Sequence, residues 1–347
     1  MRDVPPAPQV DPQVRPDVLE KFYRRALRHL AGLPTEDAER FVLRHGLLSL
    51  ARRPELSQDL RRRLEPHLRR NLARNLLHVG RFRHVVDALG DLPVCPVKGI
   101  HLLGTVYAED PEHRMMSHLD LLVRPEDAAD AAERLEHHLE DLTETKTSRA
   151  LRETAPARDL TSPDTRVDLH ARLTDSGGTW QDLEPAPGTL HDRRVSLLDA
   201  ETVLAHLTIH FVRHGPFVRL GWVEDLLRWT HSAAPLDGRR IVERARRLGG
   251  RRTFLAGLRL LGRAFGDGVL PPIPRPGAPE RRLLAVHEAL VWQGLPGDPW
   301  TAGEATSPLR RAVSGVLLAD RPGHALAFLR SRLTERRHLA RRRNPSS

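Results

Sequence analysis

The sequence predicts an α+β protein in which a small mixed sheet is flanked by helices. Two short apolar runs, at residues 119–123 and 167–173, carry polar residues at alternating positions, as the strands of a half-buried sheet do. Long stretches before and after these runs have apolar residues every three or four positions, which is typical of amphipathic helices. We therefore expect an N-terminal helical block, a central sheet and a C-terminal helical bundle.

The composition indicates a globular protein with no membrane partner. Hydrophobic residues make up 39% and charged residues 29% of the 347 positions, which allows a real core and argues against global disorder. No apolar run reaches the roughly 18 residues that a membrane span needs, and the first residues contain no apolar signal segment. The single cysteine, Cys95, excludes a disulfide framework. We expect a cytoplasmic location.

The net charge of +10 does not by itself favour a nucleic-acid partner. Only three of the 55 basic residues are lysines, namely Lys21, Lys98 and Lys146, and this skew indicates a coding bias toward arginine. The arginines are spread along several segments, often beside Asp or Glu, instead of forming one basic stripe. A basic nucleic-acid-binding accessory protein is therefore kept only as the weaker alternative.

Proline, glycine and the hydrophobic periods divide the chain into five segments. We expect a proline-rich, flexible lead-in at 1–16, an N-terminal helical region at 17–90, an α/β core at 91–198, a C-terminal helical domain at 199–340 and a tail at 341–347. In the N-terminal region, Thr35 is the expected N-cap of the second helix. The helices of this region are expected at 18–33, from 34 onward, and at 55–64 and 70–89.

The core is expected to alternate strands with short helices. A strand at 92–97 should be irregular or lie at an edge, because Pro93 and Pro96 cannot donate to a central ladder. Pro125 is placed to begin a helix, where its missing N–H costs nothing. The other expected elements are a helix at 100–107, a loop at 109–116, strands at 119–123 and 167–173, and a polar edge strand at 143–154. Later helices are expected from Asp199 or Thr202 and at 220–229, 239–248 and 254–265, followed by a linker at 266–279.

The two apolar runs bring metal-capable side chains together. His118 and Asp120 are two residues apart, as are Asp168 and His170, so each pair points to one face of its strand. If the two strands are neighbours, these groups converge on one patch of the sheet. Carboxylates that share a patch suit a hard divalent cation held against the phosphates of a nucleotide.

Short motifs follow one another in the middle of the chain, namely Lys98-Gly99, Arg114, Asp120-Leu121-Leu122-Val123, Asp168-Leu169-His170, His210, His214 and Trp222 to Asp225. This set of motifs resembles the polymerase-beta-type nucleotidyltransferase superfamily, and within it a bacterial family of uncharacterised nucleotidyltransferase-like proteins. The resemblance covers residues 94–229. It implies an α+β nucleotidyltransferase fold and metal-dependent transfer of a nucleoside monophosphate from an NTP to a small-molecule or protein hydroxyl.

The resemblance also implies residue roles. His118, Asp120 and Asp168 would be the catalytic and metal-binding residues, and the substrate would contact Lys98, Gly99, Arg114 and His170. His118 stands where the family has the first Asp of an Asp-x-Asp pair. Because imidazole suits transition metals better than Mg²⁺, Mn²⁺ or Zn²⁺ are alternatives to the expected Mg²⁺. Three interpretations stay open: an altered metal preference, a one-metal enzyme, or a catalytically impaired nucleotide-binding module.

Several candidate residues have a structural interpretation beside the functional one. Arg114 is either a phosphate ligand or an exposed loop arginine, and His170 either a metal neighbour or a general base. Cys95 is expected to be a buried small hydrophobe. His206, His210 and His214 share one helix face and could ligate zinc, but we favour packing against the sheet or the next helix. Trp222 and Asp225 are expected to pack and cap, with Asp225 pairing an arginine or a histidine.

Overall fold

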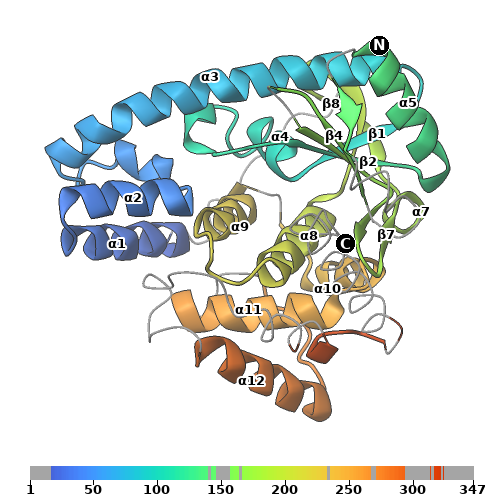
Figure 1. Cartoon of the computed structure of the whole chain (residues 1–347). Coiled ribbons are helices and arrows are strands. Elements are labelled where there is room, and N and C mark those ends of the chain that lie inside the picture. The colour runs from blue at the N-terminus through green and yellow to red at the C-terminus, as the bar shows by residue number, and fades with distance from the viewer. Residues whose placement is uncertain are drawn as a thin grey trace, which may run out of the picture.

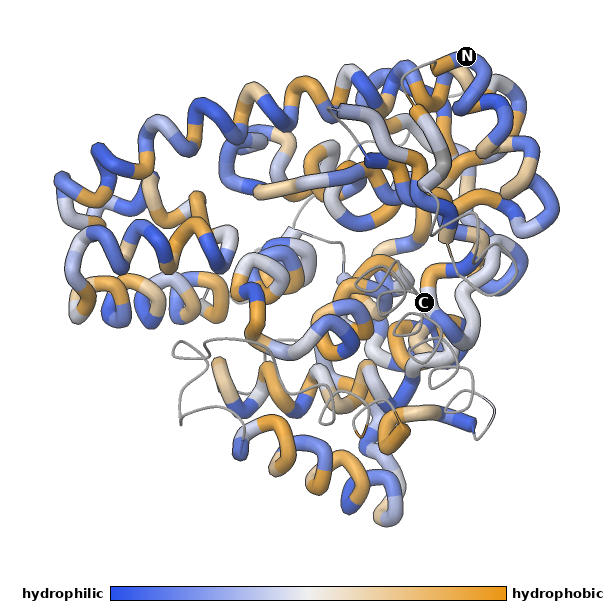
Figure 2. Tube along the Cα trace, viewed as in Figure 1, coloured by the Kyte–Doolittle hydropathy of each residue, from blue (hydrophilic) through white to orange (hydrophobic). Residues whose placement is uncertain are grey.

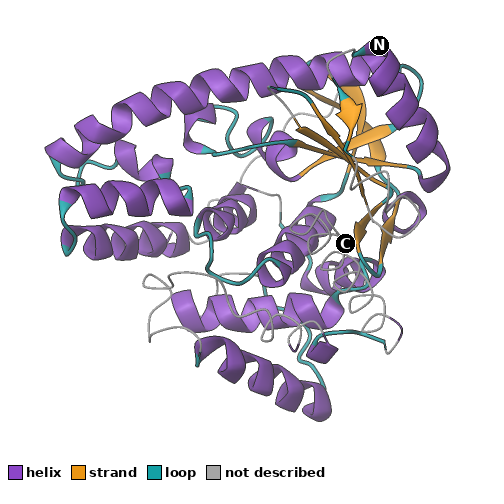
Figure 3. Ribbon diagram, viewed as in Figure 1, coloured by secondary structure: helices purple, strands orange, loops and turns teal. Residues whose placement is uncertain are grey.

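The computed structural model describes residues 17–139, 142–145, 157–163, 166–232, 235–266, 271–293, 313, 316–321 and 323. The predicted lead-in at 1–16 and tail at 341–347 lie outside these residues. Helices surround a five-stranded sheet and two small two-stranded sheets (Figure 1, Figure 3). The predicted α+β class is therefore confirmed.

The N-terminal region consists of helices α1 (Asp17–Ala31) and α2 (Thr35–His45), the 3-10 turn η1 (Leu48–Arg52) and the long helix α3 (Gln58–Leu89). The helical period predicts α1 correctly, and its apolar face is buried through Phe22, Ala26 and Leu30. The expected Thr35 cap is wrong, because Thr35 is already inside α2. The N-cap position is held by Pro34, which makes no side-chain capping bond.

The two helices expected at 55–64 and 70–89 form a single helix, α3, of 32 residues with Pro66 inside it. Ser57 caps its start by accepting a hydrogen bond from the backbone N–H of Leu60. The helix continues past Pro66 because one buried face continues past it, from Leu64 and Leu68 to Asn71 and Asn75. In Figure 1, α3 runs from the N-terminal helices across the molecule to the sheet.

The main sheet has the strand order β1-β2-β5-β4-β3. Strand β2 pairs antiparallel with β1 and parallel with β5, and β4 pairs antiparallel with both β5 and β3. β1 is an edge strand, in agreement with its prolines. β4 was not expected, since Leu160 is its only fully buried residue. The strands are β1 (Val94–Val97), β2 (Leu119–Val123), β3 (Thr143–Glu144), β4 (Ala157–Thr161) and β5 (Arg166–His170).

Helices join and cover these strands. The short helix α4 (Lys98–Leu103) follows β1, and the turn η2 (Pro111–His113) lies in the loop before β2. After β2, Pro125 begins the turn η3 (Pro125–Asp127), as predicted, and the chain continues into α5 (Ala128–His138), which contacts β3, β4 and β5. Figure 2 shows apolar and polar residues alternating along the helices, the pattern of elements that bury one side.

Two hairpins extend the core beyond the main sheet. Strand β6 (Arg172–Thr174) pairs with β7 (Gly177–Thr179), and the short helix α7 (Trp180–Leu183) follows. Strand β8 (Ala186–Leu190) pairs with β9 (Arg193–Leu197), which contacts β1. The sequence predicts the turn after Asp175 but neither hairpin.

The C-terminal helices pack around α8. Asp199, one of the two predicted starts, caps this helix by accepting a hydrogen bond from the backbone N–H of Thr202, and α8 contacts α9, α10 and α11. Within the described ranges, no helix combines the length and apolar character needed to cross a membrane. The helices are α8 (Ala200–Arg213), α9 (Gly221–Ser232), α10 (Gly238–Arg247), α11 (Arg251–Phe265) and α12 (Ala278–Trp292).

Candidate functional site

Asp120 and Asp168 lie directly side by side on neighbouring strands. β2 and β5 are parallel and in register, with Asp120 opposite Asp168, so both carboxylates point to the same face of the sheet. They are buried, with exposed fractions of 3% and 6%. The residues that alternate with Asp120, including Leu119 and Leu121, are completely buried on the other face. The apolar side of the ladder therefore fixes the direction in which the two carboxylates point.

His118 adds an imidazole to this pair of carboxylates. It immediately precedes β2, and its Nε2 lies 3.1 Å from Oδ2 of Asp120 and 3.8 Å from Oδ2 of Asp168. Its other ring nitrogen, Nδ1, lies 2.9 Å from the hydroxyl of Ser117. Ligand atoms of His118, Asp120 and Asp168 all lie within 4.8 Å of one another. This group could hold one divalent cation.

Lys98 reaches the same carboxylate from the neighbouring edge strand. It lies at the junction of β1 and α4 with φ 52°, a left-handed conformation that costs free energy for a residue with a Cβ. Its Nζ donates a hydrogen bond of 2.6 Å to Oδ1 of Asp120. At Gly99 a Cβ would lie 2.6 Å from Sδ of Met116, so this turn is closed against the loop that leads into β2.

Two further side chains from β5 contact the carboxylates. Nε2 of His170 lies 2.9 Å from Oδ1 of Asp120. Arg166 binds Asp168 through two hydrogen bonds, from Nε to Oδ1 at 2.6 Å and from Nη2 to Oδ2 at 2.7 Å. No role was predicted for Arg166. Its position two residues before Asp168, on the same strand face, is the signal that could have indicated this contact.

Asp159 is a third carboxylate in the same row that the sequence did not reveal. It lies opposite Asp168 in the antiparallel pairing of β4 with β5, and such partners share one face of the sheet. Nη2 of Arg166 lies 3.7 Å from Oδ1 of Asp159. Burial, and then the charge of Asp168, raise the pKa of Asp159. Since β4 carries almost no apolar signal, nothing in the sequence placed Asp159 here.

The charges of the site stabilise Asp120 as an anion and His118 as a cation. Burial alone would raise the pKa of Asp120, but Lys98, His118 and His170 together hold it well below its ordinary value. Burial alone would lower the pKa of His118, yet its hydrogen bond to Asp120 and the charges of Asp120 and Asp168 raise it. The buried carboxylates are thus matched by cationic groups, as their burial requires.

The family model that describes uncharacterised nucleotidyltransferases matches residues 41–266. The chain belongs to this family. The match runs from α2 to the end of α11 and includes the whole candidate site. None of the curated proteins matches the chain. Membership makes the protein nucleotidyltransferase-like and implies an NTP substrate. Nucleotidyltransferases generally use divalent metals, and the group of His118, Asp120 and Asp168 could bind one.

In this nucleotidyltransferase-like protein, Arg114 is held against α9. Its Nε lies 2.8 Å from Oδ1 of Asp225, and its side chain is 14% exposed. The alternative of an exposed loop arginine is therefore wrong, whereas the expected pairing of Asp225 with an arginine is confirmed. Tyr107 also donates a hydrogen bond of 3.0 Å to Asp225. Asp225 thus fixes the loop that leads to the candidate site.

His210 and His214, at the end of α8, pack against the next helix as predicted. The ring centroids of His210 and His214 lie 5.0 and 5.9 Å from that of Trp222 in α9. Burial lowers the pKa of both His206 and His210 well below the ordinary value, so these rings are neutral. Cys95 is completely buried, which confirms the expected small hydrophobe.

Proposed function

We propose that this chain transfers a nucleoside monophosphate from an NTP to the hydroxyl of a small molecule or a protein, with a divalent cation held by His118, Asp120 and Asp168. The observation that carries the proposal is the in-register pairing of Asp120 with Asp168, with an imidazole on the same patch. Two adjacent carboxylates are the arrangement expected for positioning metal and triphosphate together.

The donor set suits Mn²⁺ or Zn²⁺ better than Mg²⁺, because one of its three ligands is an imidazole. Such a cation would neutralise charge that develops on the phosphates during transfer. It would also compete with Lys98, whose Nζ binds Oδ1 of Asp120 in the structure. Once released from Asp120, Lys98 would be free to bind the triphosphate, beside the backbone N–H of Gly99. Arg114, fixed by Asp225, is proposed as a further phosphate contact.

The proposed reaction is an in-line displacement at the α-phosphorus. The acceptor oxygen forms a bond to phosphorus, the bond to the leaving pyrophosphate breaks, and the hydroxyl proton passes to a base. We assign the base to His170, which lies on the carboxylate face of β5 with its Nε2 against Asp120. Asp120 would orient this ring and stabilise its protonated form.

A catalytically impaired nucleotide-binding module is the second candidate, and one observation favours it. Both carboxylates already have a cationic partner within the chain, Lys98 for Asp120 and Arg166 for Asp168. His118, predicted to replace the first carboxylate of the family, adds a further imidazole. A site with this charge balance can attract a triphosphate without supporting its transfer.

Nucleotide binding and turnover in the full chain test the proposal. Each of the four NTPs is added with Mg²⁺, Mn²⁺ or Zn²⁺, and both the melting temperature and the release of pyrophosphate are measured. We expect at least one combination to raise the melting temperature and to release pyrophosphate. Asp120→Asn should reduce that release by about 100-fold or more, since even outer-shell changes at metal sites cost about 10- to 100-fold.

Asp175→Asn is the matched control. It removes a partly buried carboxylate that forms an ion pair with Arg213, 3.2 Å away, and it has no role in the proposed site. Binding without pyrophosphate release would support the binding module instead. If no NTP shifts the melting temperature with any of the three metals, both candidates are excluded. If Asp120→Asn and Asp175→Asn reduce pyrophosphate release equally, the assigned role of Asp120 is excluded.

A further inference from the structure

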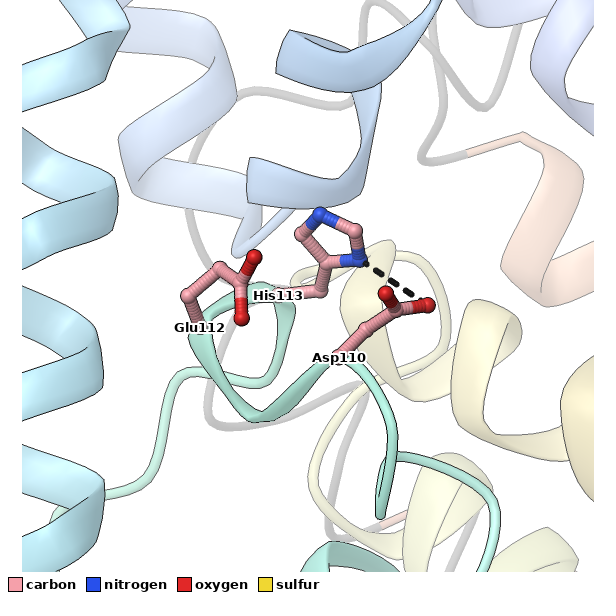
Figure 4. A group of neighbouring side chains, drawn as sticks. All are labelled: Asp110, Glu112 and His113. Carbon is pink, nitrogen blue, oxygen red and sulfur yellow. Dashed lines mark ion pairs between the residues drawn. The ribbon is translucent and has the colours of Figure 1, made fainter.

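A second group of metal-ligand side chains lies on the turn η2. Asp110, Glu112 and His113 offer ligand atoms that all lie within 4.8 Å of one another. In Figure 4 the three side chains come from one tight turn, with the imidazole of His113 between the two carboxylates. They share no residue with the group around Asp120. This turn therefore has to be considered as a site of its own.

The imidazole of His113 is buried without a hydrogen-bond partner. The residue is 5% exposed, and neither ring nitrogen has a hydrogen-bond partner among the described residues. Nδ1 lies 3.6 Å from Oδ2 of Asp110, which is longer than a hydrogen bond. An unpaired buried nitrogen costs about 1–3 kcal/mol. A metal ion bound to that nitrogen would supply the missing partner.

The protonation state of His113 suits a metal ligand. Burial lowers its pKa, although the charges of Asp110 and Glu112 partly oppose this shift. Burial thus favours the neutral imidazole, which is the form that binds metals. The side chains of Asp110 and Glu112 supply oxygen atoms beside it.

The backbone of the turn is held in place by α3. Nδ2 of Asn71 donates hydrogen bonds of 2.8 and 3.0 Å to the carbonyl oxygens of Glu112 and Arg114. Nδ2 of Asn75 donates similar bonds of 2.6 and 2.7 Å to the carbonyl oxygens of Pro111 and Arg114. Since the backbone is fixed, a cation would have to move only side chains.

The cations that now contact the two carboxylates are weak competitors. Nη2 of Arg52 lies 3.3 Å from Oε1 of Glu112, and the arginine side chain is 56% exposed. Nη1 of Arg228 lies 3.9 Å from Oδ2 of Asp110, whose side chain is 50% exposed. Each pair joins a side chain that is about half exposed to one that is largely buried, Glu112 at 17% and Arg228 at 16%, and ion pairs in contact with solvent contribute little. Ligands bound to a tetrahedral zinc ion at about 2.0–2.2 Å lie about 3.3–3.6 Å apart. Side chains whose ligand atoms now lie within 4.8 Å of one another therefore need to move inward by about 1 Å.

We propose that Asp110, Glu112 and His113 bind a divalent transition-metal ion such as Zn²⁺, at a site separate from that of Asp120. One imidazole with two carboxylate oxygens is a donor set that zinc accepts, with water completing the coordination. The ion would tie together both ends of the turn that leads to Arg114. Its role is structural, and it does not depend on the proposed transfer reaction.

Zinc titration of the full chain by calorimetry tests this site. The double variant His118→Asn, Asp120→Asn removes the other candidate group, and we expect it to retain one bound Zn²⁺ per chain. Adding Asp110→Asn should weaken that binding by about 10-fold or more. Because the side chain of Asp110 is half exposed, this change should leave the fold intact. His113→Gln, added in the same way, should have the same effect.

His67→Gln is the matched control, since His67 is a partly buried histidine paired with Glu39 away from both groups. It should leave zinc binding unchanged. The inference is overturned if the double variant binds no zinc, or if Asp110→Asn and His113→Gln leave the affinity unchanged. Equal weakening by His67→Gln would also overturn it. Should the double variant not fold, as judged by circular dichroism, Asp110→Asn in the natural chain must lower the zinc stoichiometry by one.

Discussion

His118 is the residue on which the metal chemistry of the proposed site depends. It contributes an imidazole nitrogen to a group that otherwise holds two carboxylates. Imidazole suits Zn²⁺ and related ions, whereas Mg²⁺ prefers oxygen ligands and near-octahedral geometry. The burial of Asp120 and Asp168 fixes the remaining ligands. In the proposed site, the side chain at position 118 is thus the part that we expect to determine which ion binds.

Replacing His118 by Asp is expected to move the metal preference toward Mg²⁺. The third carboxylate supplies the hard oxygen ligand that the natural chain lacks. With Mg²⁺ present, we expect the NTP-induced rise in melting temperature to increase and pyrophosphate release to grow by about 10-fold or more. With Zn²⁺ present, the NTP-induced rise in melting temperature and the release of pyrophosphate should both be smaller than in the natural chain.

His118→Asn separates charge from shape in this experiment, because it matches Asp in size but carries no anionic oxygen. It should not gain activity with Mg²⁺. Activity in His118→Asp alone would identify the natural protein as a binding module. If His118→Asp shows no more binding or pyrophosphate release with Mg²⁺ than the natural chain does, the assignment of position 118 as a metal ligand is contradicted.

The sequence predicts the centre of the site better than its surroundings. Asp120 and Asp168 could be found because each lies within an apolar run, where alternation fixes the face and a buried carboxylate needs a partner. The partners themselves depend on strand register. Asp159 meets Asp168 only because β5 pairs with β4, and the position of Arg114 depends on the packing of α9. Long-range contacts of this kind leave no local pattern.

At the scale of elements, most helices and the apolar strand β2 were predictable, whereas the strands with little apolar pattern were not. The 3.6-residue period identified α1, α8 and α11 to within a few residues. The strands of the hairpin β6–β7 have three residues each, which is too short to establish alternation. The five-residue strands β8 and β9 bury only one residue each, so they carry no clear apolar pattern. α3 shows the opposite error, because a local helix-breaking signal at Pro66 was overridden by continued burial on one face. Tertiary packing decided both cases.

Pro66 should weaken α3, and its replacement should stabilise the protein. A proline inside a helix removes one backbone hydrogen bond and crowds the preceding turn, which costs about 3 kcal/mol relative to alanine. Proline also restricts the unfolded chain, which offsets part of this cost. Residue 66 is exposed, so alanine leaves no cavity there. We expect Pro66→Ala to raise the free energy of unfolding by about 1–2 kcal/mol, measured by urea denaturation.

Pro125→Ala is the matched control for this prediction. Pro125 begins η3, where the absent N–H has no helical partner to lose, so alanine should bring no gain. Equal changes in the two variants would show that the position of the proline inside α3 is not what matters. A loss of stability in Pro66→Ala would show that α3 needs the proline at this point.

At the scale of the whole molecule, buried polar contacts connect the N-terminal helices, the core and the C-terminal helices. Tyr23 in α1 donates a hydrogen bond of 2.8 Å to Glu224 in α9, and Tyr107 after α4 donates one of 3.0 Å to Asp225. Arg228 binds Glu224 at 2.9 Å. A buried network of this kind is costly to break in part. The described parts of the N-terminal helical region, the α/β core and the C-terminal helical domain are therefore expected to unfold together.

Buried histidines should make this folding unit sensitive to acid. His45, His101 and His287 are 2%, 4% and 1% exposed, and burial lowers the pKa of each from 6.5 to about 4. Above pH 6.5 all three are neutral in the folded and the unfolded chain. As the pH falls from 6.5 toward 4, the unfolded chain takes up protons that the folded chain does not. Stability is therefore lost in this window, by about 1.4 kcal/mol per pH unit for each histidine.

Urea denaturation between pH 7.5 and 4.5 measures this loss, and His287→Gln tests its origin. Glutamine cannot titrate, so the variant should lose stability less steeply below pH 6.5, by about 1.4 kcal/mol per pH unit. His137→Gln is the control, because His137 lies at an exposed position of α5 and has water around it in both states. The same slope in the natural chain and in His287→Gln would mean that His287 takes up its proton without unfolding, and that acid sensitivity arises elsewhere. If the free energy of unfolding falls less steeply with decreasing pH in His287→Gln but not in His137→Gln, part of the acid response of the whole molecule is due to the buried ring of His287.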